Sequence, residues 1–271
     1  MTEPSEAVLA SHDAYAPAQI ALRIESGGVA KANMPALKTA TLGILAGAFI
    51  SFGAMFYTLV ITGSGLGFGP VRLLGGMAFS LGLILVLIGG AELFTGNNLI
   101  VMAWAERKVT TAQLLRNWGL VYLANFAGAI GTVVLFTLAG ALELNGGAVG
   151  QTAARIAEAK IALDPVTAFF RGVLCNTLVC LAVWLCFAAR EVTGKVLAIV
   201  FPISAFVALG FEHSVANMYL IPLGMIAAGN GIDVGAFLAN LVPVTLGNVV
   251  GGSGLVALTY WLVYLRHSDS A

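Results

Sequence analysis

Two carboxylates and one histidine stand in otherwise apolar segments of this 271-residue chain. Glu92 lies in "GAELFTGNN" (residues 90–98), and Glu212 and His213 lie in "GFEHSVAN" (residues 210–217). In such surroundings a carboxylate or imidazole can relay protons, hold a metal ion or brace an interrupted helix. Imidazole is also the side chain whose ordinary pKa lies nearest neutrality, and His213 is the one histidine away from the polar chain ends.

The composition requires lipid around these segments. Hydrophobic residues make up 59% of the chain, charged residues 10%, and the mean hydropathy is +0.95. That much apolar surface cannot be hidden inside a soluble domain, so we predict an integral membrane protein. No nucleic-acid partner is expected. Residues 1–38 contain no apolar run followed by a cleavage site, so no signal peptide is visible and the N-terminus is predicted to stay in the cytosol.

Charge-free stretches give the number of membrane spans, because a spanning helix needs about 20 predominantly apolar residues. The stretches are 39–71, 73–91, 93–105, 117–142, 172–189, 196–211, 214–232 and 234–265. Six helices fit best if two of the stretches continue their predecessors across a polar break. We therefore predict an all-α bundle whose second helix is broken at Glu92 and whose fifth is broken at Glu212 and His213.

The basic residues orient this bundle. With six spans both termini share one side, and nine lysines and arginines fall there: Arg23, Lys31, Lys38, Arg107, Lys108, Arg116, Arg190, Lys195 and Arg266. Four fall on the other side: Arg72, Arg155, Lys160 and Arg171. The positive-inside rule then places both termini in the cytoplasm. The predicted divisions are a cytoplasmic tail with a short amphipathic helix (1–35, helix within 14–33), a channel domain (36–267) and a C-terminal tail (268–271).

The two breaks are related by sequence. Gly90, Glu92 and Asn97 match Gly210, Glu212 and Asn217 at a constant offset of 120 residues (212 minus 92). "NFAGAIG" and "NVVGGSG" agree independently, with Asn125 matching Asn248 at an offset of 123. Two three-helix halves of opposite membrane orientation are expected, and paired interrupted helices of such inverted repeats meet near the bilayer midplane at the permeation site.

Glu92 and Glu212 should therefore line or brace a cavity, since ionisable groups at membrane depth need protein or water around them. The favoured interpretation is structural: each carboxylate accepts hydrogen bonds from exposed N–H groups where a half-helix starts, with Asn97 and Asn217 beside it. An ionised carboxylate in the path would repel an anion.

Four separated motifs resemble the formate/nitrite transporter family over residues 35 to 267. They are "FSLGLILVLIGGAELFTGNN", "GVLCNTLVCLAVW", "GFEHSVANM" and "PVTLGNVVGGSGLVALTYWLVYLR". The resemblance implies an aquaporin-like subunit of six helices assembled as a homopentamer. Each subunit would hold its own pore for a small monovalent anion such as formate, nitrite or hydrosulfide, with formate the first choice. "GNN" after Thr95 departs from the Thr-Ser-Thr of the best-known formate channels, which leaves the preferred anion open.

The resemblance also implies roles for individual residues. His213 would be the central pore histidine, and Thr95 would be its hydrogen-bonding neighbour. Leu83 with Phe79 would form the cytoplasmic constriction, and Leu93 with Phe206 the periplasmic one. Further matches are a vestibule lysine and two pore-flanking asparagines: Lys160, Asn176 and Asn248.

Elementary chemistry fits this assignment. Lys160 and Arg155 follow a polar stretch on the outer side, where they would raise the local anion concentration, although a solvated loop lysine is the plain alternative. Protonating a carboxylate with a pKa near 4 at pH 7 costs roughly 4 kcal/mol, far less than moving a bare ion into an apolar constriction. The hypothesis is that the anion gains a proton from His213, or through water there, and crosses as neutral acid.

Two other classes stay open from the residues alone. A neutral-solute channel of the aquaporin type would show Asn-Pro-Ala at both half-helix starts, and neither "LFTGNN" nor "HSVANM" supplies it. A membrane metalloenzyme would need about three protein ligands, and no second histidine converges on His213 by sequence. Cys175, Cys180 and Cys186 are spaced for neither a disulfide nor a helical metal pair. No cofactor, metal ion or enzymatic activity is therefore expected.

Overall fold

The computed structural model describes residues 13–229 and 231–266, and these residues contain helices and no strand. Six helices are long and apolar enough to cross a membrane, which confirms the predicted number of spans. They are α3 (Ala36–Ile61), α4 (Phe68–Gly89), α6 (Thr111–Leu138), α8 (Pro165–Ala188), α9 (Val192–Leu209) and the continuous helix Val234–Tyr264. The last consists of α11 (Val234–Val249), a π-helical stretch η3 (Val250–Leu258) and α12 (Thr259–Tyr264).

The second and fifth spans are interrupted where the sequence predicted. α4 stops at Gly89, residues 91–93 are not helical, and the chain resumes in a 3₁₀ turn η1 (Gly96–Ile100) and α5 (Val101–Ala105). α9 stops at Leu209 and α10 (Ser214–Ala227) begins after His213. Gly90 and Gly210 end the two helices with φ of 83° and 73°, a left-handed conformation in which glycine has no steric penalty. The breaks thus begin two residues before each glutamate.

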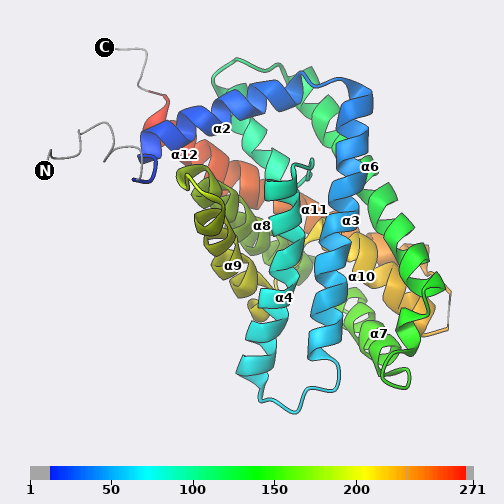
Figure 1. Ribbon diagram of the computed structural model, residues 1–271. Coiled ribbons are helices and arrows are strands. Elements are labelled where there is room, and N and C mark those ends of the chain that lie inside the picture. Colours follow the sequence, from blue (N-terminus) through cyan, green and yellow to red (C-terminus); the bar gives the residue numbers. More distant parts are fainter. Residues whose placement is uncertain (1–12, 230, 267–271) are drawn as a thin grey trace, which may run out of the picture.

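Short helices cover the two ends of the bundle (Figure 1). α2 (Pro17–Ala32) lies across one end beside α12, and α7 (Ala148–Ile161), preceded by η2 (Ala141–Glu143), lies at the other and packs on α10. α2 lies within residues 14–33, where the sequence predicted an amphipathic helix, and it buries Ile20 and Ile24. An ion pair of 2.6 Å joins Glu25 of α2 to Lys108 before α6. The predicted C-terminal tail, 268–271, lies outside the described residues.

Glycines let the spans of each half approach closely. A Cβ placed on Gly47 of α3 would lie 2.1 Å from the carbonyl oxygen of Asn125 on α6. In the second half, a Cβ on Gly251 of η3 would lie 2.1 Å from the carbonyl oxygen of Val173 on α8. Contacts this short exclude any side chain, so backbone meets backbone at both crossings. Large apolar side chains such as Leu123 and Phe201 instead remain exposed on the outside of the chain, as expected for lipid or subunit contacts.

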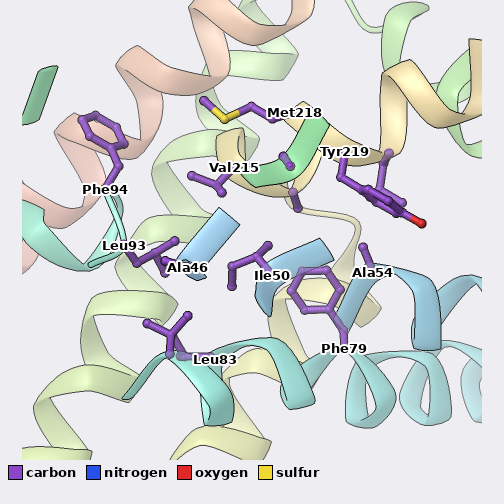
Figure 2. Close-up of a cluster of buried hydrophobic side chains, with 14 of the residues drawn as sticks. Ala46, Ile50, Ala54, Phe79, Leu83, Leu93, Phe94, Val215, Met218 and Tyr219 are labelled. Atoms are coloured by element: carbon purple, nitrogen blue, oxygen red, sulfur yellow. The ribbon is translucent and has the colours of Figure 1, made fainter. Parts of the chain in front are cut away.

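The centre of the bundle is an apolar cluster built from both halves. Figure 2 shows Ile50, Phe79, Leu83 and Leu93 converging with Val215, which belongs to the start of α10. All five side chains are buried. The two helix breaks therefore lie next to this cluster and not at the surface.

Candidate pore site at the two helix breaks

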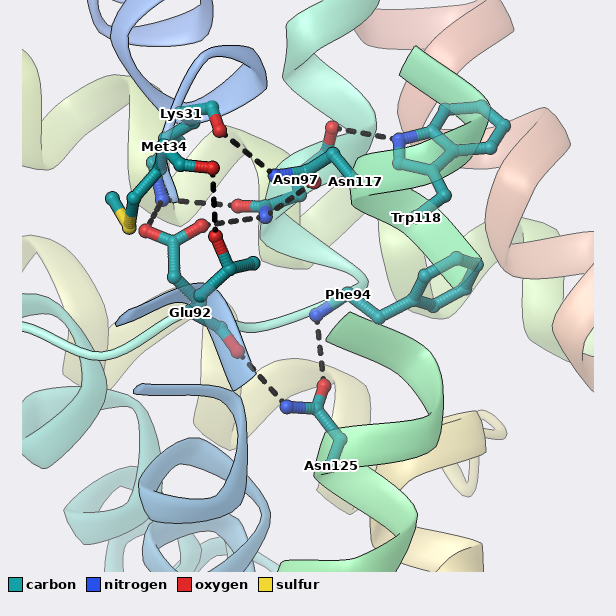
Figure 3. Close-up of polar contacts among 9 residues, drawn as sticks. Lys31, Met34, Glu92, Phe94, Asn97, Asn117, Trp118 and Asn125 are labelled. Carbon is teal, nitrogen blue, oxygen red and sulfur yellow. Dashed lines mark hydrogen bonds and ion pairs between the residues drawn. The ribbon is translucent and has the colours of Figure 1, made fainter. Parts of the chain in front are cut away.

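The Glu92 carboxylate is held by a lysine and an asparagine (Figure 3). Its Oε1 pairs with Lys31 Nζ of α2 at 2.7 Å, and its Oε2 accepts a hydrogen bond of 2.7 Å from Asn97 Nδ2. Asn97 also donates to Asn117 Oδ1 on α6, and Asn117 donates back to the carbonyl oxygen of Lys31 at 3.1 Å. These bonds form a closed polar ring. One oxygen of the buried Glu92 carboxylate pairs with the Lys31 ammonium, and the other accepts the hydrogen bond from Asn97.

Glu212 has the same arrangement in the second half of the chain. Lys160 Nζ of α7 lies 2.9 Å from its Oε1, and Asn217 Nδ2 donates to its Oε2 at 2.7 Å. Asn217 donates to Asn240 Oδ1, and Asn240 donates to the carbonyl oxygen of Lys160, both at 2.8 Å. Lys160 thus lies on a helix and is ion-paired, which rules out the alternative of a solvated loop lysine.

Two asparagines hold the broken backbone itself. Asn125 donates to the carbonyl oxygens of Gly43 and Glu92 at 2.7 and 2.9 Å and accepts from Phe94 N–H at 2.9 Å. Asn248 repeats this pattern with Gly172, Glu212 and Ser214, at 2.8, 3.0 and 2.9 Å. The favoured prediction was that the two carboxylates accept hydrogen bonds from backbone N–H groups. It was wrong, because the donors to both carboxylates are side chains. Amide side chains bind the backbone, since they offer a donor and an acceptor together, whereas a carboxylate only accepts.

His213 and Thr95 connect the two breaks. Thr95 Oγ1 lies 2.9 Å from His213 Nε2, and His213 Nδ1 accepts the N–H of Ala216 at 3.1 Å as the N-cap of α10. Because Nδ1 is an acceptor, the proton of a neutral imidazole belongs on Nε2, where it points at the Thr95 hydroxyl. Asn176 lies behind Thr95, donating to its carbonyl oxygen at 3.2 Å and to the carbonyl oxygen of Asn248 at 2.7 Å.

Two cavities approach this centre from opposite ends. The α2-side cavity has a volume of about 530 Å³ and is lined by Lys31, Glu92, Leu83 and Leu93 among others. The α7-side cavity has a volume of about 480 Å³, and its lining includes Lys160, Glu212, His213, Phe79 and Phe206. Neither cavity is lined by Thr95, Asn176 or Asn248. These three residues contact other parts of the protein instead.

The structure groups the four constriction residues differently from what the resemblance implied. Phe79 and Phe206 lie on the same side and form an edge-to-face pair with ring centroids 5.5 Å apart. Leu83 and Leu93 both line the α2-side cavity. Phe79 and Leu83 lie one turn apart on the same side of α4, so they reach different cavities because they are displaced along the helix axis. The resemblance instead paired Leu83 with Phe79 and Leu93 with Phe206.

Sequence reasoning missed three members of the polar rings: Lys31, Asn117 and Asn240. The signal was present, because Asn117 and Asn240 differ by 123 residues, the offset that relates Asn125 to Asn248.

In the described part of the chain, no three His, Cys, Asp or Glu side chains gather as a metal site.

The sequence profile of one family, described as formate/nitrite transporter, matches residues 18–262 of this chain. The chain belongs to that family. Among curated members, the formate channel FocA of Escherichia coli K12 is 42% identical over 276 residues, which cover 95% of this chain and 97% of FocA.

Solved structures of the family resemble this transporter closely. A pentameric formate channel with formate bound has a TM-score of 0.77 at 39% identity and covers 85% of this chain and 98% of its own. An FNT family ion channel has a TM-score of 0.81 at 29% identity, with coverage of 90% and 98%.

Proposed function

We propose that this transporter-family chain forms a membrane channel for formate, in which the anion crosses together with a proton. The observation that carries the proposal is the pair of cavities that end at apolar side chains beside the hydrogen-bonded Thr95 and His213. The formate channels of the family, 42% and 39% identical to this chain, support formate as the substrate. Nitrite and hydrosulfide are the alternatives, because each is also a small monovalent anion of a weak acid.

The subunit is proposed to be an aquaporin-like inverted repeat. The polar rings of Glu92 and Glu212 use the same residue types in the same bonds, and α2 and α7, which supply their lysines, lie at opposite ends of the bundle (Figure 1). A two-fold relation in the membrane plane would produce this inversion. The α2 end is assigned to the cytoplasm of a bacterial or archaeal inner membrane by the positive-inside rule, and a homopentamer is assigned by likeness to the solved pentameric channel.

The apolar pairs at the centre make proton transfer the less costly route. A bare ion meeting Phe79 and Phe206 or Leu83 and Leu93 would lose most of its hydration, at a cost of tens of kcal/mol in a low-dielectric medium. Taking up one proton costs a carboxylate of pKa near 4 only about 4 kcal/mol at pH 7. Lys160 and Lys31 attract the anion into either cavity, while their glutamates keep the bound charge small enough for release.

The hydrogen bonds of His213 limit how it can serve as the donor. Its neutral ring holds one proton, on Nε2, and can give a proton to an anion in the α7-side cavity, which His213 lines, only if a second proton reaches the ring. That proton must land on Nδ1, which already accepts the Ala216 N–H. We infer that His213 gives up its Nε2 proton only as the Ala216 hydrogen bond to Nδ1 opens and a proton from water reaches Nδ1.

The test is uptake by proteoliposomes that contain a pH indicator. Formate, nitrite and hydrosulfide are compared in counterflow with wild type, His213→Asn and His267→Asn; the last is a matched substitution beyond residues 18–262 of the family match. In net uptake down a formate gradient, we expect wild type and His267→Asn to acidify the liposome interior, because formate arrives there with a proton. Proton-coupled uptake by His213→Asn should fall by roughly 10²-fold, the usual size of a general acid contribution. Formate current without proton movement in wild type would contradict proton transfer, and equal coupled rates in both variants would remove His213 from the mechanism.

A further inference from the structure

The α7-side cavity carries more positive charge than its partner. Its lining includes four cations, Arg72, Arg155, Lys160 and Arg171, against one carboxylate, Glu212. The α2-side cavity has two lysines, Lys31 and Lys38, against Glu92. Since Lys160 already neutralises Glu212, the excess resides on the arginines.

Two of these arginines are held against the same residue. Nη2 of Arg72 and Nη1 of Arg171 lie 2.9 and 4.0 Å from one point, the position of a Cβ on Gly210. Arg72 Nε donates to the carbonyl oxygen of Ala208 at 2.9 Å, and Arg171 Nη1 donates to that of Gly210 at 3.4 Å. Both side chains are half-buried, and neither has a carboxylate within 4.0 Å in the described part of the chain. Two like charges thus approach the same glycine without a counter-ion.

Capping of α9 accounts for part of this geometry, because cations stabilise the carbonyl end of a helix. Capping uses few of the available donors. Each guanidinium carries five N–H groups, and each arginine donates only one of them to a carbonyl oxygen. The remaining N–H groups belong to residues that line the α7-side cavity. A cap would also need only one cation.

The repeat does not explain the pair either. Glu212 N–H donates to the carbonyl oxygen of Arg171, and Glu92 N–H donates to that of Leu42, both at 3.2 Å, so Arg171 and Leu42 occupy equivalent places. An apolar side chain therefore satisfies the architecture at this position. The charge on Arg171 is specific to the α7 end.

We propose that Arg72 and Arg171 form a binding site for a small tetrahedral dianion, of the chemistry of sulfate or hydrogenphosphate, at the α7-side mouth of the pore. Two forked cations match the charge of a dianion and can donate to several of its four oxygens, whereas a monovalent anion leaves one positive charge unmatched. A dianion needs two protons to become neutral, so it cannot cross as the weak acid does. The bound dianion stops flux by occupying the cavity that ends at Phe79 and Phe206. Block rests on the proposed function, but binding does not.

Binding is tested with sulfate on the purified full-length protein in detergent, by calorimetry and by thermal stabilisation at constant ionic strength against chloride. Arg171→Gln and Arg72→Gln each remove one guanidinium group. Arg155→Gln is the matched control, because Arg155 lines the same cavity but is exposed and hydrogen-bonded to Thr152. We expect sulfate to bind roughly tenfold more weakly to each of the first two, the usual worth of a charged hydrogen bond, and about equally to Arg155→Gln.

Three results would overturn the site. They are no stabilisation by sulfate beyond chloride in wild type, an equal loss in Arg155→Gln, and undiminished binding in Arg171→Gln. If Arg72→Gln does not assemble, sulfate binding to Arg171→Gln and Arg171→Lys decides whether the site exists. Lysine keeps the positive charge but lacks the paired N–H donors of the guanidinium group. Sulfate inhibition of formate uptake is then measured in proteoliposomes. If wild type does not carry formate, the proposed function fails while the calorimetric result stands.

Discussion

Replacing Lys160 by methionine should destabilise the protein far more than replacing Lys31, although both lysines pair with a buried glutamate. The side chain of Lys160 is 15% exposed and that of Lys31 is 34% exposed, while their partners Glu212 and Glu92 are 4% and 6% exposed. Methionine fills the space of the lysine stem in both cases. The two variants therefore compare one chemical change in a closed and in a wetter setting.

The expected sizes follow from burial. Removing one partner of a buried ion pair costs about 3–5 kcal/mol, because the other charge is left without compensation. Lys160→Met should approach this figure, since Glu212 retains Asn217 as its remaining side-chain donor. Lys31→Met should cost about 1–3 kcal/mol because water already reaches that pair. At roughly 2–4 °C for each kcal/mol, the melting temperatures should fall by about 10 °C and about 5 °C respectively.

The assay is heating of detergent-solubilised protein followed by size-exclusion chromatography at fixed concentration. Lys38→Met is the control, because Lys38 is exposed and has no carboxylate within 4.0 Å in the described residues; it should stay within about 0.5 kcal/mol of wild type. Adding Glu212→Gln to Lys160→Met should recover about 2 kcal/mol, since no charge is then left buried. Equal losses for Lys160→Met and Lys38→Met, or a double variant worse than the single, would refute this reasoning.

Three further outcomes follow from local contacts. Gly210→Ala should cost about 1–2 kcal/mol in melting experiments, because φ is 73° there and the new Cβ would meet Arg72; no change would mean that the break relaxes freely. Asp164 caps α8, and hydrogen bonding, chiefly to Thr167, lowers the pKa of Asp164. Its stabilisation is complete above its ordinary pKa and is lost as the pH falls through the lowered value, so Asp164→Ala should melt earlier than wild type at pH 7 and together with it in strong acid. Lys108→Ala should speed hydrogen exchange in α2 by roughly tenfold, because Glu25 is left buried without its ion pair; unchanged exchange would show that apolar packing alone holds α2.

The sequence determined the spans, the breaks and their pairing, because these depend on local properties. Hydropathy over about 20 residues decides whether a segment dissolves in lipid, and a glycine beside a glutamate within such a segment marks an interruption. The constant offset between Glu92 and Glu212 corresponds to two polar rings that use the same residue types in the same bonds. Motif resemblance extended this to His213 and Thr95, which the fold brings within 2.9 Å.

Only the tertiary structure decided which groups meet. Lys31 and Glu92 are 61 residues apart. No local sequence pattern predicts that α2 folds back so that the Lys31 ammonium contacts the Glu92 carboxylate. The same holds for the constriction residues, whose grouping depends on where each lies along α4 relative to α9, and for Arg72 and Arg171, whose positions depend on where α4 and α8 pass the end of α9. The orientation and crossing of these helices depend on packing along their whole length. Close glycine contacts, such as Gly47 against Asn125, set the distance between the helices.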